Sequence, residues 1–217
     1  MSKLEVREIG PISGETVVRL ADGATAIGFG GGGPSAVKIF ESDGTWTNPG
    51  VSMIMVEVQG AGSSGRSTGL TYVRGAGGGY AKKLIDVSSI SSATITIGLG
   101  GAGIPSNGGS GNVGGSSIWY DGINTVTGGG GSAHATVGPD AAAGGVASGG
   151  DLNINGQSSG QWTSAFAGSS FLGCVDPFNG EETDYEPIPG YGGGGGHGYM
   201  AYPSRPGGDG IVIVTEY

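Results

Sequence analysis

The residues best suited to binding chemistry lie in the longest glycine-poor stretch, from Gln157 to Pro189. Aromatic rings offer stacking faces to sugars and a large contact area at low entropic cost. The stretch contains Trp162, Phe166, Phe171, Phe178 and Tyr185. We therefore expect a loop that recognises a ligand through these rings. The alternative is that Trp162, Phe166 and Phe171 form a small local core that supports the loop.

A second group of candidate contact residues flanks the last glycine run. It comprises Tyr191, His197, Tyr199 and Tyr202. His197 could donate or accept a hydrogen bond, or it could be an exposed spacer, and the same two interpretations apply to His134. We expect these residues near one end of a glycine-rich structure.

Carboxylates in the same region raise the question of a metal site. Asp176, Glu181, Glu182, Asp184 and Glu186 supply the oxygen atoms that calcium prefers. Their spacing departs from that of an EF-hand loop, and the segment GGDLNINGQ departs from the calcium-binding nonapeptide repeat. The pattern favours a solvated acidic loop, so we expect no metal and no cofactor. Whether Asp176 to Glu186 binds a cation stays open.

Catalytic signatures are weak. Neither an HExxH motif nor a paired-histidine arrangement is present, and the chain has 2 His in all. Spacings of the form GxGxxG arise by chance among 52 Gly and lack a βαβ context. Cys174 has no neighbouring base in the sequence. We expect no enzyme, although a carboxylate-pair glycosidase acting on surface polysaccharide stays possible.

Composition limits the class of protein. The chain has 217 residues with 52 Gly and 10 Pro, yet only 12% are charged and 36% are hydrophobic, which favours a folded chain over a disordered one. The net charge is −9, and no Lys or Arg lies between Leu84 and Ser204. Such a surface repels phosphate backbones, so we expect no nucleic acid partner. A single cysteine and the lack of a leader or long apolar run predict a protein that is soluble when made.

Short stretches with a two-residue period, bounded by Gly, Pro, Asn or Asp, predict an all-β fold. We expect strands at 36–40, 51–58, 80–87, 93–97, 116–120, 152–154 and 211–216. A weak helical pattern is confined to Asp140 to Ala143.

Glycine clusters separate these strands. They lie at 28–33, 60–65, 75–79, 98–103, 108–115, 128–131, 144–150, 192–198 and 207–210, without the period of collagen. Ordering so many glycines is entropically costly and requires a specific compensation. Polyproline-II-type helices lacking Cβ atoms could lie side by side and pair their backbone groups. The sequence therefore predicts a β-sandwich with polyglycine-II-like helices whose intervening segments are display loops.

The order of the motifs resembles a known family. Thr45-Trp46-Thr47 with Asn48-Pro49-Gly50 is followed by VSMIMVEVQG, GAGGGYAKKLIDV, ATITIGLGGAG, GGSS, GGDLNINGQ and GGDGIVIVTEY. This series is similar to the glycine-rich domain of bacteriophage tail-fibre and receptor-binding proteins, including T-even-type adhesins, and it covers roughly residues 40–217. The resemblance implies attachment to a receptor on the bacterial surface, either an outer-membrane protein or a glycan.

The resemblance also implies a place in the virion. Residues 41–217 would form the receptor-binding domain at a distal fibre or tail tip, in a protein made in the host cytoplasm. Residues 1–40 resemble short segments that dock to other tail proteins or oligomerise, and many such appendages are homotrimers. Two alternatives stay open: a structural tail component without receptor contact, and a surface-polysaccharide depolymerase. An ice-binding glycine bundle is a remote further option.

Overall fold

The computed structural model describes residues 18–19, 25–26, 33–66, 74–105, 109–133, 141–160, 166–173, 190–196 and 203–217. Over these ranges the protein is all-β and contains no helix, so the predicted class is confirmed. Residues 141–143 are not helical, so the weak helical pattern is wrong for them. Nothing within the same ranges is a helix long and apolar enough to cross a membrane.

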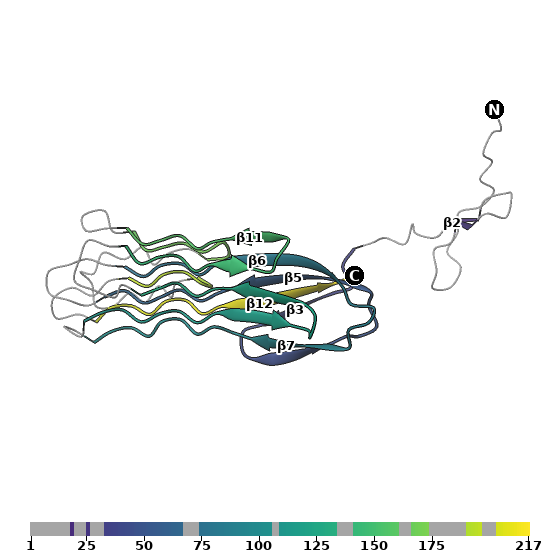
Figure 1. The fold of residues 1–217 in the computed structure, drawn as a ribbon, viewed down its shortest axis with the longest axis horizontal. Coiled ribbons are helices and arrows are strands. Elements are labelled where there is room, and N and C mark those ends of the chain that lie inside the picture. The colour runs from purple at the N-terminus through teal and green to yellow at the C-terminus, as the bar shows by residue number, and fades with distance from the viewer. Residues whose placement is uncertain are drawn as a thin grey trace, which may run out of the picture.

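The molecule is elongated, with strands gathered at one end and glycine-rich segments running away from them (Figure 1). The strands are β1 (Val18–Arg19), β2 (Thr25–Ala26), β3 (Ala36–Phe40), β4 (Gly44–Thr47), β5 (Met53–Gln59), β6 (Tyr80–Asp86), β7 (Ser92–Thr96), β8 (Ser117–Tyr120), β9 (Thr125–Gly128), β10 (Ala147–Ser148), β11 (Leu152–Ile154) and β12 (Ile211–Glu216).

Most strands belong to two five-stranded antiparallel sheets. The first, called here the β5 sheet, has the order β11-β6-β5-β12-β3. The second, called here the β8 sheet, has the order β10-β9-β8-β7-β4. β1 and β2 form a separate antiparallel pair. β3, at residues 36–40, is an edge strand of the β5 sheet. The sequence analysis ended the N-terminal segment at residue 40 and so placed this strand outside the glycine-rich domain.

One hydrophobic core joins the two sheets. Alternate residues of β5 point into it, and Ile54, Val56 and Val58 are fully buried, as expected for a strand with one core-facing side. The β8 sheet contributes both Trp46, on β4, and Trp119, on β8, whose rings lie 5.4 Å apart at 51°. Aromatic pairs with this tilted geometry add to the stabilisation from buried area. The core therefore draws large side chains from both sheets and holds them face to face.

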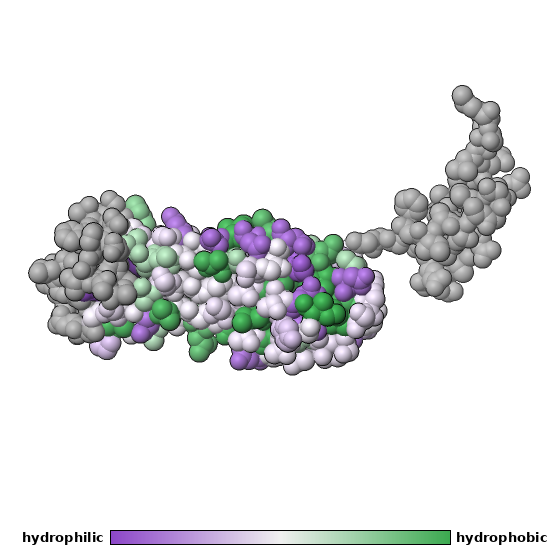
Figure 2. Space-filling model, viewed as in Figure 1, coloured by the Kyte–Doolittle hydropathy of each residue, from purple (hydrophilic) through white to green (hydrophobic). Residues whose placement is uncertain are grey.

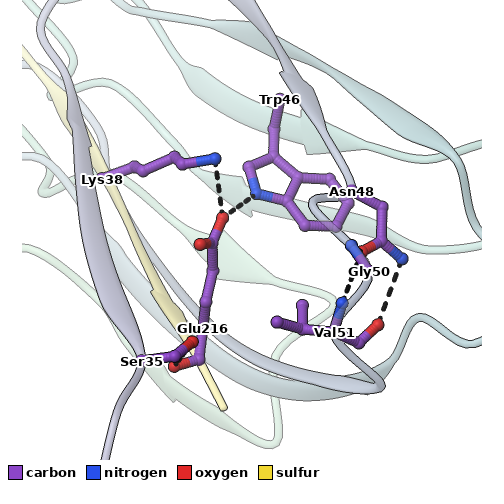
Figure 3. Close-up of polar contacts among 7 residues, drawn as sticks. All are labelled: Ser35, Lys38, Trp46, Asn48, Gly50, Val51 and Glu216. Carbon is purple, nitrogen blue, oxygen red and sulfur yellow. Dashed lines mark hydrogen bonds and ion pairs between the residues drawn. The ribbon is translucent and has the colours of Figure 1, made fainter.

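A buried carboxylate ties the C-terminal strand to the first strands of the domain (Figure 3). Glu216 accepts a hydrogen bond from Trp46 Nε1 at 2.8 Å and pairs with Lys38 Nζ at 2.8 Å. Burial raises the pKa of Glu216, but the hydrogen bonds from Lys38 and Trp46 and the charge of Lys38 outweigh burial, so the pKa lies below its ordinary value. The ionised form of Glu216 therefore stabilises the fold.

The turn after β4 is built on one side-chain amide. Asn48 Oδ1 accepts the backbone N–H groups of Gly50 and Val51 at 2.8 and 3.0 Å. Its Nδ2 donates to the carbonyls of Val87 and Ile90 at 2.9 and 3.0 Å. Asn48 thus fixes its own turn, where Gly50 has φ of 105°, and fastens that turn to the loop between β6 and β7.

The glycine-rich segments are hydrogen-bonded to one another through their backbones. Donor and acceptor pairs from one segment are, in chain order, Gly60 to Gly79, Ala61 to Gly115, Gly62 to Gly208, Ser63 to Ala76, Ser64 to Asn112 and Gly65 to Arg205. Residues 60–62 thus bond to three neighbouring segments in turn, and residues 63–65 bond to the same three segments in the same order. Each acceptor in the second set lies three residues before the corresponding acceptor in the first set. A second series runs from Ser204, Gly207 and Gly210 to Ile104, Gly101 and Gly98. Both series have a three-residue period.

Burial follows the same period at the surface of this group of segments. Leu99, Ala102 and Pro105 are exposed, whereas Gly98, Gly101 and Ile104 are buried. The inner segments 60–66, 74–79 and 192–196 are buried throughout. A Cβ atom on Gly62 would lie 2.0 Å from the carbonyl oxygen of Gly193. Inner positions therefore require glycine or a very small residue because neighbouring backbones occupy the side-chain space.

Most predicted strands are present within a few residues of their expected bounds. The sequence analysis missed β1, β2, β4, β9 and β10. β4 reads GTWT and β9 reads TVTG, so each is short and contains or ends in glycine, which signalled a turn or a connection instead.

Replacing Glu216 with Gln should lower the free energy of unfolding by about 1–2 kcal/mol at pH 7, because the charge paired with Lys38 is lost. The folded pKa of Glu216 is depressed, so its contribution is present above the unfolded pKa of about 4.3 and is lost as pH falls through the folded value. Urea unfolding of both proteins from pH 7 to pH 3 should show the difference shrinking with acid. A difference that is constant over this range would contradict the role of the charge.

Two neighbouring positions test the backbone packing. Gly101→Ala should cost at least about 3 kcal/mol, because its Cβ would lie 2.2 Å from the carbonyl oxygen of Asn112. The matched control is Ala102→Val, at an exposed position of the same segment, which should stay within about 0.5 kcal/mol of wild type. Thermal and urea unfolding measure both variants. Equal effects at the two positions would contradict the close backbone contact.

Candidate functional site

The glycine-rich segments have two ends, and each gathers different side chains. We call the end that meets the strands the junction, marked by Gln59, Tyr80 and Gly210. We call the opposite end the tip, marked by Arg66, Ile104, Gly160, Phe166 and Ser204. Contacts between segments define the tip, with Gly160 N donating to Phe166 O and Ser204 N donating to Ile104 O, both at 2.8 Å.

Several connections leave and re-enter the described structure at the tip. The residues on either side of 67–73, 106–108, 134–140, 161–165 and 197–202 belong to adjacent segments there, as the bonds Gly65 to Arg205, Arg205 to Gly196 and Ser132 to Ala143 show. Phe166, at one of these flanks, is 68% exposed. The tip therefore brings together the ends of chain segments that are far apart in sequence.

Arginine is concentrated at the tip, a feature that sequence reasoning missed. Arg66 and Arg74 are 6% and 7% exposed, and Arg205 is partly buried. Gly65 N donates to Arg205 O at 3.2 Å, and Gly75, next to Arg74, donates to Gly195 O at 2.8 Å, so the three arginines lie on adjacent segments. In the sequence, the three arginines stand at or near the edges of glycine clusters, which could have indicated their position. They place three guanidinium groups at the tip of a chain with net charge −9.

Phe171 lies at the junction instead. Its ring is 56% exposed and stacks on the buried ring of Tyr80 with centroids 4.3 Å apart and planes 30° apart. The hydroxyl of Tyr80 donates to Glu57, and Lys82 Nζ lies 3.5 Å from the same Glu57 oxygen. Burial, followed by the hydrogen bond to Glu57 and the charge of Glu57, raises the pKa of Tyr80. A supported aromatic ring thus stands beside a Glu–Lys pair.

Tyr191 is also at the junction. Its hydroxyl donates to Glu41, just after β3, and this hydrogen bond, with smaller effects of burial and charge, raises the pKa of Tyr191. Gly192 N donates to Asp209 O at 2.8 Å, and Leu172 N donates to Gln59 Oε1 at 3.3 Å. Residues 170–173 and 190–192 therefore cross the end of the β5 sheet; we call them the collar.

Of the predicted binding residues, the structure describes Phe166, Phe171 and Tyr191. It does not bring the three together, since Phe166 is at the tip and the other two are at the junction. Phe171 has a packing partner in Tyr80, and Phe166 is largely exposed. Outside the described residues lie Trp162, Phe178, Tyr185, His197, Tyr199 and Tyr202, together with His134, Cys174 and the carboxylates Asp176, Glu181, Glu182, Asp184 and Glu186.

Metal and nucleophile chemistry find little support in the described part of the chain. No group of three or more His, Cys, Asp or Glu side chains in it could hold a metal ion.

Gly156 to Gly160 has the GxSxG spacing of a nucleophile elbow, which the sequence analysis passed over. Its central serine, Ser158, lies in an irregular segment without helix or strand, and Ser158 Oγ accepts from Gly144 N at 3.3 Å. This is not the strand-to-helix turn that exposes such a serine.

No family model matches the chain, and no curated protein matches it significantly in sequence. Function therefore has to be inferred from the geometry of the chain and from its motifs.

Tyr80→Phe should separate the stack from the hydroxyl contact at the junction. The ring contact with Phe171 stays, but loss of the bond to Glu57 should cost about 1.5–3 kcal/mol at pH 8. The raised pKa of Tyr80 means that its contribution is full below the unfolded value of about 10 and falls as pH rises through the folded value. Urea unfolding at pH 8 and above pH 10 measures the change. An unchanged midpoint at pH 8 would contradict the bond to Glu57.

Proposed function

We propose that the glycine-rich segments are polyglycine-II-type helices bundled next to a short-strand β-sandwich. The supporting observation is that the backbone hydrogen bonds from Gly60 to Gly65 to neighbouring segments repeat every three residues. This period matches the three residues per turn of that helix. Successive N–H groups of such a helix point in three directions, so they bond to three different neighbours. Absence of Cβ atoms allows the approach that these bonds need.

We propose further that the protein is a bacteriophage receptor-binding protein at a tail-fibre or tail tip, which attaches the virion to the bacterial surface. The resemblance of the ordered motifs supports this proposal, as does the collection of chain connections at one end of a rigid bundle. In such a bundle the backbone carries the packing, so residues at the tip can differ without disturbing the inner segments. Binding residues are commonly found on loops positioned by a rigid scaffold.

The tip holds the primary contact in this proposal. Phe166 offers an exposed ring, the arginines add positive charge, and Trp162, His197, Tyr199 and Tyr202 lie in the connecting sequences. The remaining proposals follow the resemblance: residues 1–40 dock to another tail protein, and the assembled appendage is a homotrimer whose several tips bind with avidity. Figure 2 shows a mostly pale, weakly polar surface along the bundle, which suits a shaft.

Two alternative functions differ from this proposal in what the chain contacts or does at the cell surface. A purely structural tail component would contact no receptor, and a depolymerase would shorten surface polysaccharide. The second is less well supported, because no metal-binding cluster and no nucleophile elbow are found in the described ranges.

Competition for adsorption tests the proposal. Purified protein, added to a susceptible host before the phage, should reduce adsorption in proportion to its concentration. A variant in which Gly-Ser linkers replace 161–165 and 197–202 should lose this effect while its melting temperature stays within a few degrees, because the flanking segments remain paired. The matched control inserts a Gly-Ser linker between the exposed residues Ser88 and Ser89, in the loop between β6 and β7, and is tested on the same host. Competition that survives the tip replacement would overturn the tip as the contact, and shortened polysaccharide would favour the depolymerase.

A further inference from the structure

Phe171 has the features of a binding platform and differs in place and support from the tip. One face of its ring rests on Tyr80, which is 1% exposed, while 56% of Phe171 is exposed. Its backbone is held on both sides, by Ser170 N to Gly173 O at 3.3 Å and by Leu172 N to Gln59 Oε1 at 3.3 Å. A large apolar ring that is fixed in place and open to solvent on one face offers a stacking surface to a ligand at low entropic cost.

The strand register puts a row of side chains directly beside this ring. The row crosses the whole β5 sheet and consists of Leu152, Lys82, Glu57, Ile213 and Ile39, in strand order. Leu152 and Ile39 are 47% and 60% exposed, and the side chains of Lys82 and Glu57 are 37% and 21% exposed. Tyr80 lies two residues from Lys82 on β6, so the Phe171 stack and the collar border this row.

The row has the length and the chemistry of an extended glycan site. Four spacings between neighbouring strands, at roughly 4.8 Å each, give about 19 Å, which several linked sugar rings would span. The apolar face of a pyranose can stack on Phe171 and lie against Leu152 and Ile39. Tyr80 and Lys82 both contact Glu57 Oε1, so Oε2 can accept from a sugar hydroxyl while the Lys82 ammonium donates.

We propose that the row and Phe171 form a lateral binding site for a neutral oligosaccharide of the bacterial surface. Charge selects the ligand: Glu57 and Lys82 offset each other within the row, and Glu41 lies beside it, so the site offers no excess of positive charge to a polyanionic polymer. The biological partner rests on the proposed attachment function. The site itself depends only on the junction residues, at the opposite end of the bundle from the tip.

A glycan array tests the site. Labelled full-length protein is applied to printed bacterial surface oligosaccharides, and the strongest neutral hit is titrated in solution against 15N-labelled protein. We expect weak binding that shifts the amide signals of Lys82 and Leu152. Phe171→Ala should weaken it at least tenfold, Phe171→Trp should keep it, and Glu57→Gln should weaken it severalfold. Tyr120→Ala, which removes an aromatic ring of similar exposure, 51%, from the β8 sheet, is the matched control and should leave it unchanged.

Thermal unfolding of each variant keeps the result interpretable, because Phe171→Trp and Glu57→Gln preserve the shape of the junction if Phe171→Ala does not fold. Failure of the array to bind any neutral glycan, or equal binding by Phe171→Ala, overturns the site. So does a change in sedimentation on mutating Phe171 without glycan binding, since that would make the row a contact between copies of the chain. The array result stands whether or not purified protein blocks adsorption, so failure of the attachment function is detected separately.

Discussion

Close approach of one backbone to another is the constraint on which the rest of this molecule depends. A Cβ atom on Gly75 or Gly78 would meet a carbonyl oxygen at about 2 Å, at 1.9 and 2.0 Å respectively. At that distance the neighbouring N–H and C=O groups can bond directly, and the inner segments become fully buried with no apolar side chain larger than the methyl groups of Ala61 and Ala76. Within the bundle, main-chain pairing replaces apolar burial as the source of order, and hydrogen bonds between the segments offset the loss of glycine entropy.

The sheets make that arrangement possible because they fix the register of the segments at their starting points. Gln59, the last residue of β5, is buried and its Nε2 lies within hydrogen-bonding distance of the carbonyls of Gly60, Gly78 and Gly79. Farther into the sheets, the hydrogen bond from Trp46 to Glu216 connects the first and the last motif of the series that resembles the glycine-rich family. TWTNPG and GIVIVTEY are therefore related by a direct contact, so their joint presence in the sequence has a structural reason.

Much of the fold could be predicted because alternation marks strands and glycine marks close approach. The three-residue period of GLGGAGIP was also present in the sequence: its exposed positions, Leu99, Ala102 and Pro105, are non-glycine at every third place. What the sequence could not reveal is the end at which each connection lies. Residues 166–173 return to the junction without an intervening strand, so nothing local separates Phe166 at the tip from Phe171 beside Tyr80. Tyr80 itself carried no signal, because its partner is 91 residues away along the chain.

The tip and the β5 sheet differ in how freely their exposed residues can change. The inner bundle is paired through its backbone, so an exposed side chain at the tip, such as Phe166, can change with little effect on that pairing. Side chains of the β5 sheet have no such freedom, since alternate residues of the same strands, such as Val56 and Val58, form the core. Under the proposed function, a lateral glycan contact would therefore change slowly and bind broadly, while the tip would change quickly and bind selectively. Weak contact on the sheet would hold the protein at the cell surface, and its high local concentration there would let even a modest affinity at the tip decide attachment.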